Sequence, residues 1–454
     1  MSGEPQVSTP PPAGRGARLR AVLRSDVQRL TTTGVPHLFA AVLLTQGIST
    51  LRRILLVRIL SLAEQGQMAY VMQIADFLAL VADLGITTAT LKYAAEPVST
   101  ERKREWYCAG LQWGTLSATV GALLYMAVAL MFPLHAEATV RLFLLLIVPY
   151  IPLAAIAKIP IVFMQAQKDI KRAARFTAIT QVLTLVLLVG ATYFFHLWGF
   201  FITVTAAPLS NLAILVVATR RDLRWFALSW KLAKRLISFG SFSLLANMAG
   251  MAAITASTVM LRWLTGSDAE VGLFAIGLMI MSTTRLLPAT LMQTAFPYLS
   301  GILLDPQRLR ARVWELAVKQ ALVMAGVAVL WLLVGRYAIV LLLGAKCADS
   351  FWSSVVLVLG GIPFAFSAAA AQAMLVLDRV RVNFCAGLIL LVGTVAGMYI
   401  FTPPLGALGA AIAMTLAQLA GTLFSVIVAM TILRRLAARA GDVAATPGSE
   451  EGVR

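Results

Sequence analysis

Long apolar stretches separated by short gaps dominate this sequence, and they constrain its fold more than any other feature. A helix crosses the hydrocarbon core of a bilayer with about 20 apolar residues. Twelve stretches of this kind occur, at residues 37–60, 67–91, 107–132, 140–164, 174–195, 198–219, 236–261, 271–297, 314–335, 351–377, 383–402 and 405–433. The chain is therefore predicted to be an all-α polytopic membrane protein.

The positive charges alternate between the gaps, and this alternation predicts the topology. Of the 38 Lys and Arg residues, 28 lie in the two tails and in or at the edges of every second gap, whereas four lie in or at the edges of the other gaps. Cytoplasmic loops carry the excess of Lys and Arg in membrane proteins. Both termini are expected in the cytoplasm and the protein in the cell inner membrane. Insertion topology and anionic headgroups explain the net charge of +18 without a nucleic-acid partner.

The gaps and tails are too short to hold a globular domain. The expected segments are a disordered basic tail (1–34), a first lobe of six spans (35–219), a central cytoplasmic loop (220–235), a second lobe (236–433) and a cytoplasmic tail (434–454). The three cysteines have no CxxC or metal-ligand spacing. We therefore predict no metal site, no cofactor and no enzyme activity.

A related hairpin occurs in both halves and indicates an internal repeat. The first copy reads VRILSLAEQGQMAYVMQI from Val57, and the second reads LRWLTGSDAEVGLFAIGLMI from Leu261. The matched pairs are Arg58 with Arg262, Leu60 with Leu264, and Gly66 with Gly272. Two related six-helix lobes around a central cavity are the arrangement of a transporter.

From this hairpin onward the chain resembles a known family. The segments are LSLAEQGQMAY and ADLGITTATLKYAAE in the first half, followed by EVGLFAIG, TAFPYLSG, LLLGAKCADSFW and VLDRVRVNF in the second. They resemble the polysaccharide and O-antigen flippases of lipid-linked oligosaccharides, in the multidrug/oligosaccharidyl-lipid/polysaccharide exporter superfamily. The resemblance covers about residues 40–435.

The resemblance implies a transporter that alternates access to a cationic cavity. Its cargo would be an undecaprenyl-diphosphate-linked oligosaccharide, moved from the cytoplasmic to the outer leaflet for lipopolysaccharide or exopolysaccharide biosynthesis. The expected partners are this cargo, membrane lipids, a polysaccharide polymerase and chain-length proteins. The protein itself is expected to be a monomer. No GxxxxGK[ST] motif for ATP binding occurs, so an ion gradient, the membrane potential or consumption of the flipped product would supply the energy.

Basic residues inside the spans are the candidates for binding such a cargo. An Arg at the centre of a span costs about 2.5–3.5 kcal/mol, so it indicates a cavity or a partner. Arg285 near the middle of the eighth span is either an anion site or half of a structural ion pair. The adjacent Arg52 and Arg53 point about 100° apart, so only one is expected to face the cavity. The other predicted cavity residues are Lys158, Asn247 and Thr284.

Two carboxylates lie well inside the spans. Asp76 and Asp83 are seven residues apart in the second span, almost two helical turns, and therefore share one face. They predict either a relay for a cation or proton, or ion pairs with the arginines of the first span.

Two other function classes remain open. A drug or small-molecule antiporter of the same superfamily would concentrate acidic residues in its cavity. Once the first and last two residues of each span are set aside, six basic and two acidic residues lie inside these spans. A membrane polysaccharide polymerase or glycosyltransferase would present a large external loop, and the longest external gap is only 336–350. The flippase is the preferred prediction.

Overall fold

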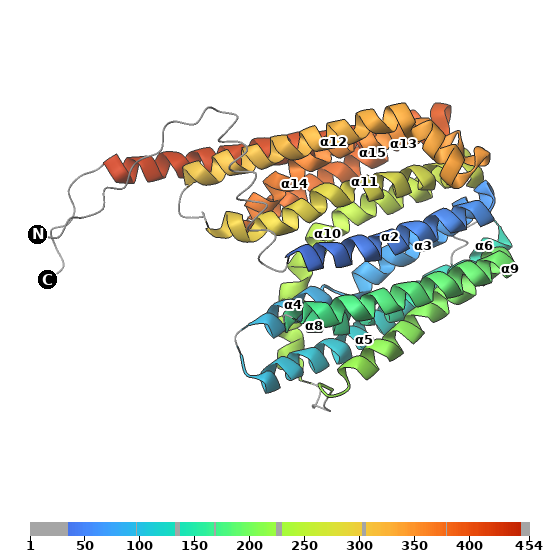
Figure 1. The fold of residues 1–454 in the computed structure, drawn as a ribbon, viewed down its shortest axis with the longest axis horizontal. Helices are drawn as coiled ribbons and strands as arrows, with labels where there is room; N and C mark the ends of the chain where they lie inside the picture. The colour runs from blue at the N-terminus through green and yellow to red at the C-terminus, as the bar shows by residue number, and fades with distance from the viewer. Residues whose placement is uncertain are drawn as a thin grey trace, which may run out of the picture.

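The computed structural model describes residues 35–96, 98–131, 137–167, 169–223, 229–301, 306–377 and 379–445. Within these ranges the chain forms helices and turns, with no strand. The helices run roughly parallel to one long axis and form two groups, one from each half of the chain (Figure 1). This arrangement confirms the predicted all-α, two-lobed fold.

The helices of the first half follow the first six predicted spans. They are α2 (Val35–Ile59), α3 (Leu62–Ala82), α4 (Ile86–Ala95), α5 (Thr100–Met131), α6 (Ala138–Leu146), α7 (Tyr150–Ile156), α8 (Lys158–Ala166) and α9 (Ile170–Thr219). Helices α3 and α4 form one span bent by 47°. Helices α6, α7 and α8 together form the fourth span, and α9 contains the fifth and sixth.

The helices of the second half follow the remaining spans. They are α10 (Trp230–Thr265), α11 (Asp268–Gly301), α12 (Pro306–Leu343), the short 3-10 helix η1 (Ala345–Cys347), α13 (Ser350–Leu359), α14 (Gly361–Val376) and α15 (Val380–Ala445). Helix α10 includes the last six residues of the predicted central loop, and α15 extends beyond residue 433 into the predicted tail. The predicted N-terminal tail, 1–34, lies outside the described residues.

Seven of the described helical segments are long and apolar enough to cross a membrane, and the bent pair of α3 and α4 makes an eighth. Helices α9 and α15 each count as one segment but contain a reversal, at His196 and Gly406 respectively. Each therefore crosses twice. With α2 and α10, the described helices supply the twelve predicted crossings.

The two reversals have the same local structure, which supports the internal repeat. His196 and Gly406 have φ values of 49° and 53°. Three residues later, Gly199 and Gly409 each approach a carbonyl of the preceding helix so closely that an added Cβ would lie 2.0 Å from its oxygen. Sequence analysis missed this second pair of equivalent positions.

The hydrogen bonds within each half repeat as well. In the first half Thr205 donates to the carbonyl of Leu146 at 3.3 Å, and in the second Thr415 donates to that of Val356 at 3.0 Å. Both bonds join residues 59 positions apart, from the last span of the lobe to the broken fourth span. The two lobes therefore share a fold as well as a hairpin sequence.

The lobes meet where the repeated glycines of α3 and α11 pack against each other. A Cβ added to Gly66 would lie 1.8 Å from the carbonyl oxygen of Asp268, and one added to Gly272 would lie 2.2 Å from that of Leu62. Only glycine allows the two backbones to approach this closely. The sequence match between Gly66 and Gly272 thus marks a close contact between the lobes, in the first turns of α3 and α11.

A second close approach joins the lobes nearer the other end of the bundle. Leu84 and Gly85, with φ values of 48° and 70°, form the bend between α3 and α4. A Cβ added to Gly85 would lie 2.1 Å from the carbonyl oxygen of Gly240 in α10. The bent span therefore contacts the second lobe through both of its helices.

We predict that Gly66→Val destabilises the protein, because the added side chain must push α3 away from α11. Overpacking of this kind costs about 1–3 kcal/mol. Gly190→Val is the matched control, since Gly190 also lies in a helix and nothing lies within 4 Å of its added Cβ. The measurement is the thermal unfolding temperature of each purified protein in detergent. Equal unfolding temperatures for the two variants would contradict the close interface.

Candidate functional site: a cationic cavity between the lobes

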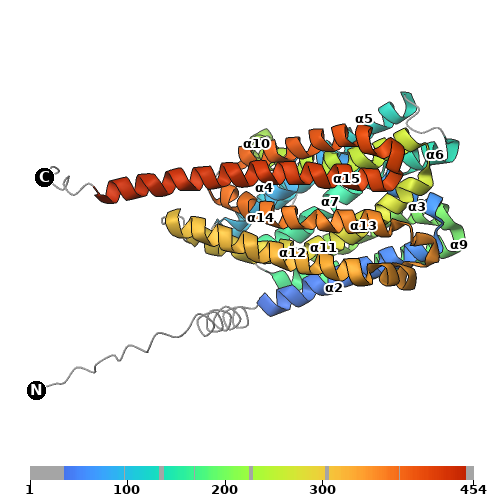
Figure 2. The ribbon, with the colours of Figure 1, turned by 90° about the horizontal axis from the view of Figure 1, so that it is seen from above.

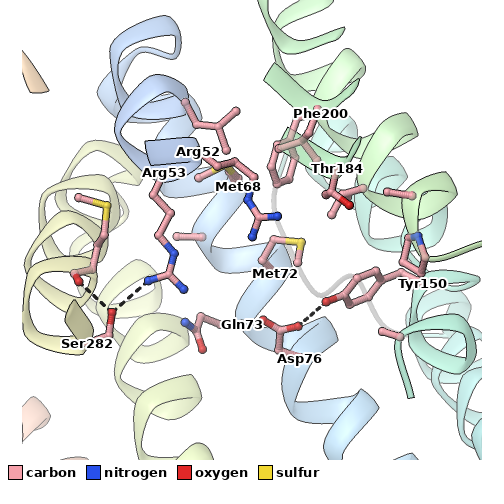
Figure 3. A pocket seen from close by; sticks show the side chains of 18 of the residues that line it. Arg52, Arg53, Met68, Met72, Gln73, Asp76, Tyr150, Thr184, Phe200 and Ser282 are labelled. Carbon is pink, nitrogen blue, oxygen red and sulfur yellow. Dashed lines mark hydrogen bonds between the residues drawn. The ribbon is translucent and has the colours of Figure 1, made fainter. Parts of the chain in front are cut away.

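A cavity of about 590 Å³ lies beside the lobe interface. Helices α2, α3, α7, α8 and α9 of the first half supply most of its wall, and α10 and α11 supply the rest. Figure 2 shows α2 and α11 running along the same side of the bundle. The close-up in Figure 3 shows the polar side chains gathered between α2, α3 and their neighbours.

Both Arg52 and Arg53 line this cavity, which corrects the expectation that only one would face it. Arg52 donates through Nη1 to Oε1 of Gln181 in α9 at 3.4 Å. Arg53 donates through Nη1 to Oγ of Ser282 in α11 at 3.0 Å (Figure 3). Because α2 lies between the two lobes, side chains 100° apart reach opposite walls of one cavity.

Lys158 lines the same cavity from the opposite side of the first lobe. It is the first residue of α8, directly after the break that separates α7 from α8. Pro160, in the first turn of α8, has no N–H to donate, and prolines are tolerated at such positions. The break leaves the Lys158 side chain exposed to the cavity.

Asp76 is the one carboxylate among the residues that line the cavity. It accepts a hydrogen bond from the hydroxyl of Tyr150 at 2.7 Å (Figure 3). Lys158 and Arg53 both attract its negative charge. Asp76 therefore lies within the cationic cluster and offsets part of its charge.

Asp83 lies at the bend between α3 and α4 and is not among the cavity residues. Its Oδ1 accepts hydrogen bonds from the hydroxyl of Thr87 at 2.6 Å and from the Thr87 backbone N–H at 3.3 Å. These bonds stabilise the first turn of α4, where backbone N–H groups lack helical partners. The geometry therefore gives the two acidic residues different surroundings.

Three predicted cavity residues lie elsewhere in the second lobe. Arg285 in α11 packs against the ring of Phe364, with 4.4 Å from its guanidinium carbon to the ring centroid. The hydroxyl of Thr284 donates back to the Met281 carbonyl of its own helix at 2.9 Å. Asn247 in α10 is exposed and lies outside the cavity lining.

The charge balance of the cavity favours anions. Among its lining residues, three are basic (Arg52, Arg53 and Lys158), and only Asp76 is acidic. Arginine donates paired N–H groups that match phosphate oxygens, and such charge-assisted bonds are stronger than neutral ones. The cavity can therefore bind an anionic ligand at a depth where the bilayer itself excludes charge.

Neutral polar side chains on α3, α7 and α9 also line the cavity, and sequence analysis missed them. They are Gln65, Gln73, Tyr150, Thr177, Thr180, Gln181, Thr184 and Asn211. Asn211 donates to the hydroxyl of Thr184 at 3.2 Å, which ties the two halves of α9 together. Amide side chains inside apolar spans were an available signal, because polar groups in a bilayer seek a cavity or a partner.

Two cations connect the lobes at the end of the bundle where α2 joins α3. Arg58 of the first lobe donates to the carbonyls of Leu341 and Leu342, and its Nε lies 2.7 Å from the Leu342 oxygen. Lys346 of the second lobe donates to the carbonyls of Arg58 and Leu60. Each cation thus binds the unpaired carbonyls at the C-terminal end of the other lobe's helix. We call this reciprocal contact the clasp.

The sequence was compared with models of known protein families. Residues 32–303, more than half of the chain, match the family model described as "Polysaccharide biosynthesis protein". No curated protein matches the sequence.

Several solved structures share the fold. An inward-facing multidrug resistance MATE family transporter of the MOP superfamily gives a TM-score of 0.75 at 13% identity, over 86% of this chain and 96% of that one. The lipid II flippase MurJ, in an inward closed conformation, gives 0.70 at 12% identity, over 91% and 94%. An outward-facing MATE family transporter gives 0.60 at 12% identity, over 87% and 96%. At 12–13% identity, these likenesses show that the chain shares the fold of these proteins.

We predict that the Asp76–Tyr150 hydrogen bond contributes measurably to stability. A double-mutant cycle of Asp76→Ala and Tyr150→Phe should give a coupling energy of about 1.5–3 kcal/mol, the range for a bond to a charged group. The measurement is the unfolding free energy of each variant in mixed detergent micelles. Additive effects of the two substitutions would show that the bond contributes nothing.

Proposed function

The chain belongs to the polysaccharide biosynthesis protein family, and from this premise we propose that it is a flippase for a lipid-linked oligosaccharide. Its cargo is an oligosaccharide on undecaprenyl diphosphate, moved by alternating access from the cytoplasmic to the outer leaflet of the inner membrane. The product serves cell-surface polysaccharide biosynthesis. The observation that carries the proposal is the charge of the cavity, whose lining includes three basic residues and a single carboxylate.

The cavity matches the chemistry of this cargo. The diphosphate requires positive charge at membrane depth, and the guanidinium groups of Arg52 and Arg53 reach into the cavity from one helix. Hydroxyl and amide groups on α9 provide partners for sugar hydroxyls. At about 590 Å³ the cavity is in the range of sites that hold drug-sized ligands. That volume suits a diphosphate with a few sugars rather than a finished polysaccharide.

The conformation suits uptake of the cargo from the cytoplasm. The positive-inside distribution of Lys and Arg orients both termini toward the cytoplasm, so the clasp faces outward. The clasp and the Gly66–Gly272 contact close the outer end. Cargo therefore enters this state from the cytoplasmic leaflet.

The charge of the cavity disfavours the second candidate, an antiporter of organic cations. A cationic drug would meet Arg52, Arg53 and Lys158 with only Asp76 as a counter-charge. Like charges brought together in a site of low dielectric repel more strongly than in water. The same fold therefore carries an anionic cargo here.

The function is tested in cells that lack this protein, by measuring which leaflet holds the polyprenyl-diphosphate saccharides. A wild-type copy should clear them from the cytoplasmic face. The double variant Arg52→Gln/Arg53→Gln should lower this rate at least about tenfold, since each lost charge-assisted bond is worth about 1.5–3 kcal/mol. Lys319→Gln is the control, because Lys319 pairs with Glu315 on an exposed part of α12. Normal clearance by the double variant, at normal membrane levels, would refute the anion-binding cavity.

The outward closure makes a separate prediction. Replacing both clasp cations, in Arg58→Gln/Lys346→Gln, should favour opening toward the outside. A cysteine at Met68, which lines the cavity near the clasp, would then react several-fold faster with a membrane-impermeant maleimide added to intact cells. The background carries Cys385→Ser, because Cys385 is exposed whereas Cys108 and Cys347 are buried.

Arg336→Gln is the matched control for the clasp, since Arg336 is an exposed basic residue in the last turns of the same helix, α12. It should leave the labelling rate unchanged. An equal rate in the clasp variant and the control would show that the clasp does not hold the outer end closed.

A further inference from the structure

Arg285 has an environment unlike that of the cavity arginines. Its guanidinium lies over the ring of Phe364, and its Nε is buried without a hydrogen-bond partner. Among the described residues no carboxylate forms an ion pair with it. The aromatic ring attracts one face of the cation, but the N–H donors lie along the edge of the guanidinium plane, where a ring offers no acceptor.

A second unpaired polar side chain lies in the same lobe. Gln320 of α12 is only 3% exposed, and neither its amide nitrogen nor its amide oxygen has a partner in the described part of the chain. A buried carboxamide without hydrogen bonds is costly and uncommon, so its presence requires an explanation.

The packing of α11, α12 and α14 brings Arg285, Gln320 and Phe364 to a similar level along the helix axes. Helices α12 and α14 run in opposite directions, and their register is fixed by two contacts. The rings of Trp314 and Phe366 are 5.6 Å apart, and Met324 Cε lies 2.4 Å from where a Cβ on Gly361 would be. Residue 320 lies between 314 and 324. Along the helix axes it is therefore within about one turn of the level of Phe364, the ring that Arg285 covers.

We infer that α11, α12 and α14 form a binding site for a compact monovalent anion, a halide ion or a carboxylate, between Arg285 and Gln320 beside Phe364. In the described part of the chain, the Nε–H of Arg285 and the carboxamide N–H₂ group of Gln320 are buried donors without acceptors, and an anion supplies acceptors to both. Phe364 holds the guanidinium plane, so that its edge rather than its face meets the anion.

This site is separate from the cargo cavity and goes beyond the proposed function. Arg285 is absent from the cavity lining, although it lies one helical turn from Ser282, which accepts a hydrogen bond from Arg53. The ligand comes either from a free small anion or from the carboxylate of an acidic sugar. Both sources supply a compact group with one negative charge, and the two probes below distinguish them.

Anion binding is measured with the purified full-length protein in detergent, in a buffer whose only other anion is bulky. The starting protein carries Arg52→Gln/Arg53→Gln, which weakens anion binding in the central cavity. Bromide and acetate are titrated separately, and the melting temperature is recorded. We expect a saturable rise with at least one probe. Adding Arg285→Gln should abolish the rise, and adding Gln320→Leu should raise the half-saturating concentration at least tenfold.

Lys319→Gln is the matched control, because Lys319 is adjacent to Gln320 but exposed and paired with Glu315. It should leave the titration unchanged. Saturation by bromide identifies a halide-sized ion as the ligand, whereas saturation by acetate alone identifies a carboxylate. No saturable rise with either probe, or an unchanged rise in both the Arg285→Gln and the Gln320→Leu proteins, overturns the site. Because no cargo is present, this result is independent of whether the protein flips a lipid-linked oligosaccharide.

Discussion

Positive charge held at membrane depth is the constraint on which this structure depends. A guanidinium in hydrocarbon is costly, and the cost is met only where protein or water surrounds it. Helix α2 meets this requirement by running between the two lobes. Arg52 bonds to Gln181 of the first lobe, and Arg53 bonds to Ser282 of the second. One helix thus exposes two cations to a single cavity, and the hydrogen bond from Arg53 to Ser282 places a cation at the junction of the lobes.

The rest of the fold holds this junction together. Glycines in the first turns of α3 and α11 let the backbones of the two helices touch without side chains between them. The clasp closes one end through two cations bonded to helix C-termini, a contact between charges and dipoles that water can replace. Such interactions suit a transporter, because an interface that must open repeatedly cannot rely on a deeply interlocked apolar core.

Much of the fold could be predicted from the sequence, because hydropathy, loop charge and a repeated hairpin are local signals. The match of Gly66 with Gly272 even identified two residues that touch in the structure. The cavity itself was harder to predict. That both Arg52 and Arg53 face it follows from the position of α2 between the lobes, which is a tertiary fact. Tyr150 was missed because its role depends on a neighbour, Asp76, in a different span. For Arg285, its depth in the bilayer was predictable but the ring it packs against was not.

The central claim is that this protein moves a polyprenyl-diphosphate saccharide between leaflets, and reconstitution tests it most directly. Purified protein would be placed in vesicles with a fluorescent short-chain polyprenyl-diphosphate saccharide, and an impermeant quencher would report the fraction in the outer leaflet over time. We predict that wild-type protein speeds the exchange between leaflets well above that in vesicles without protein, and that Arg52→Gln/Arg53→Gln does not. Exchange at the protein-free rate, by wild-type protein shown to be folded in the vesicles, would contradict the account.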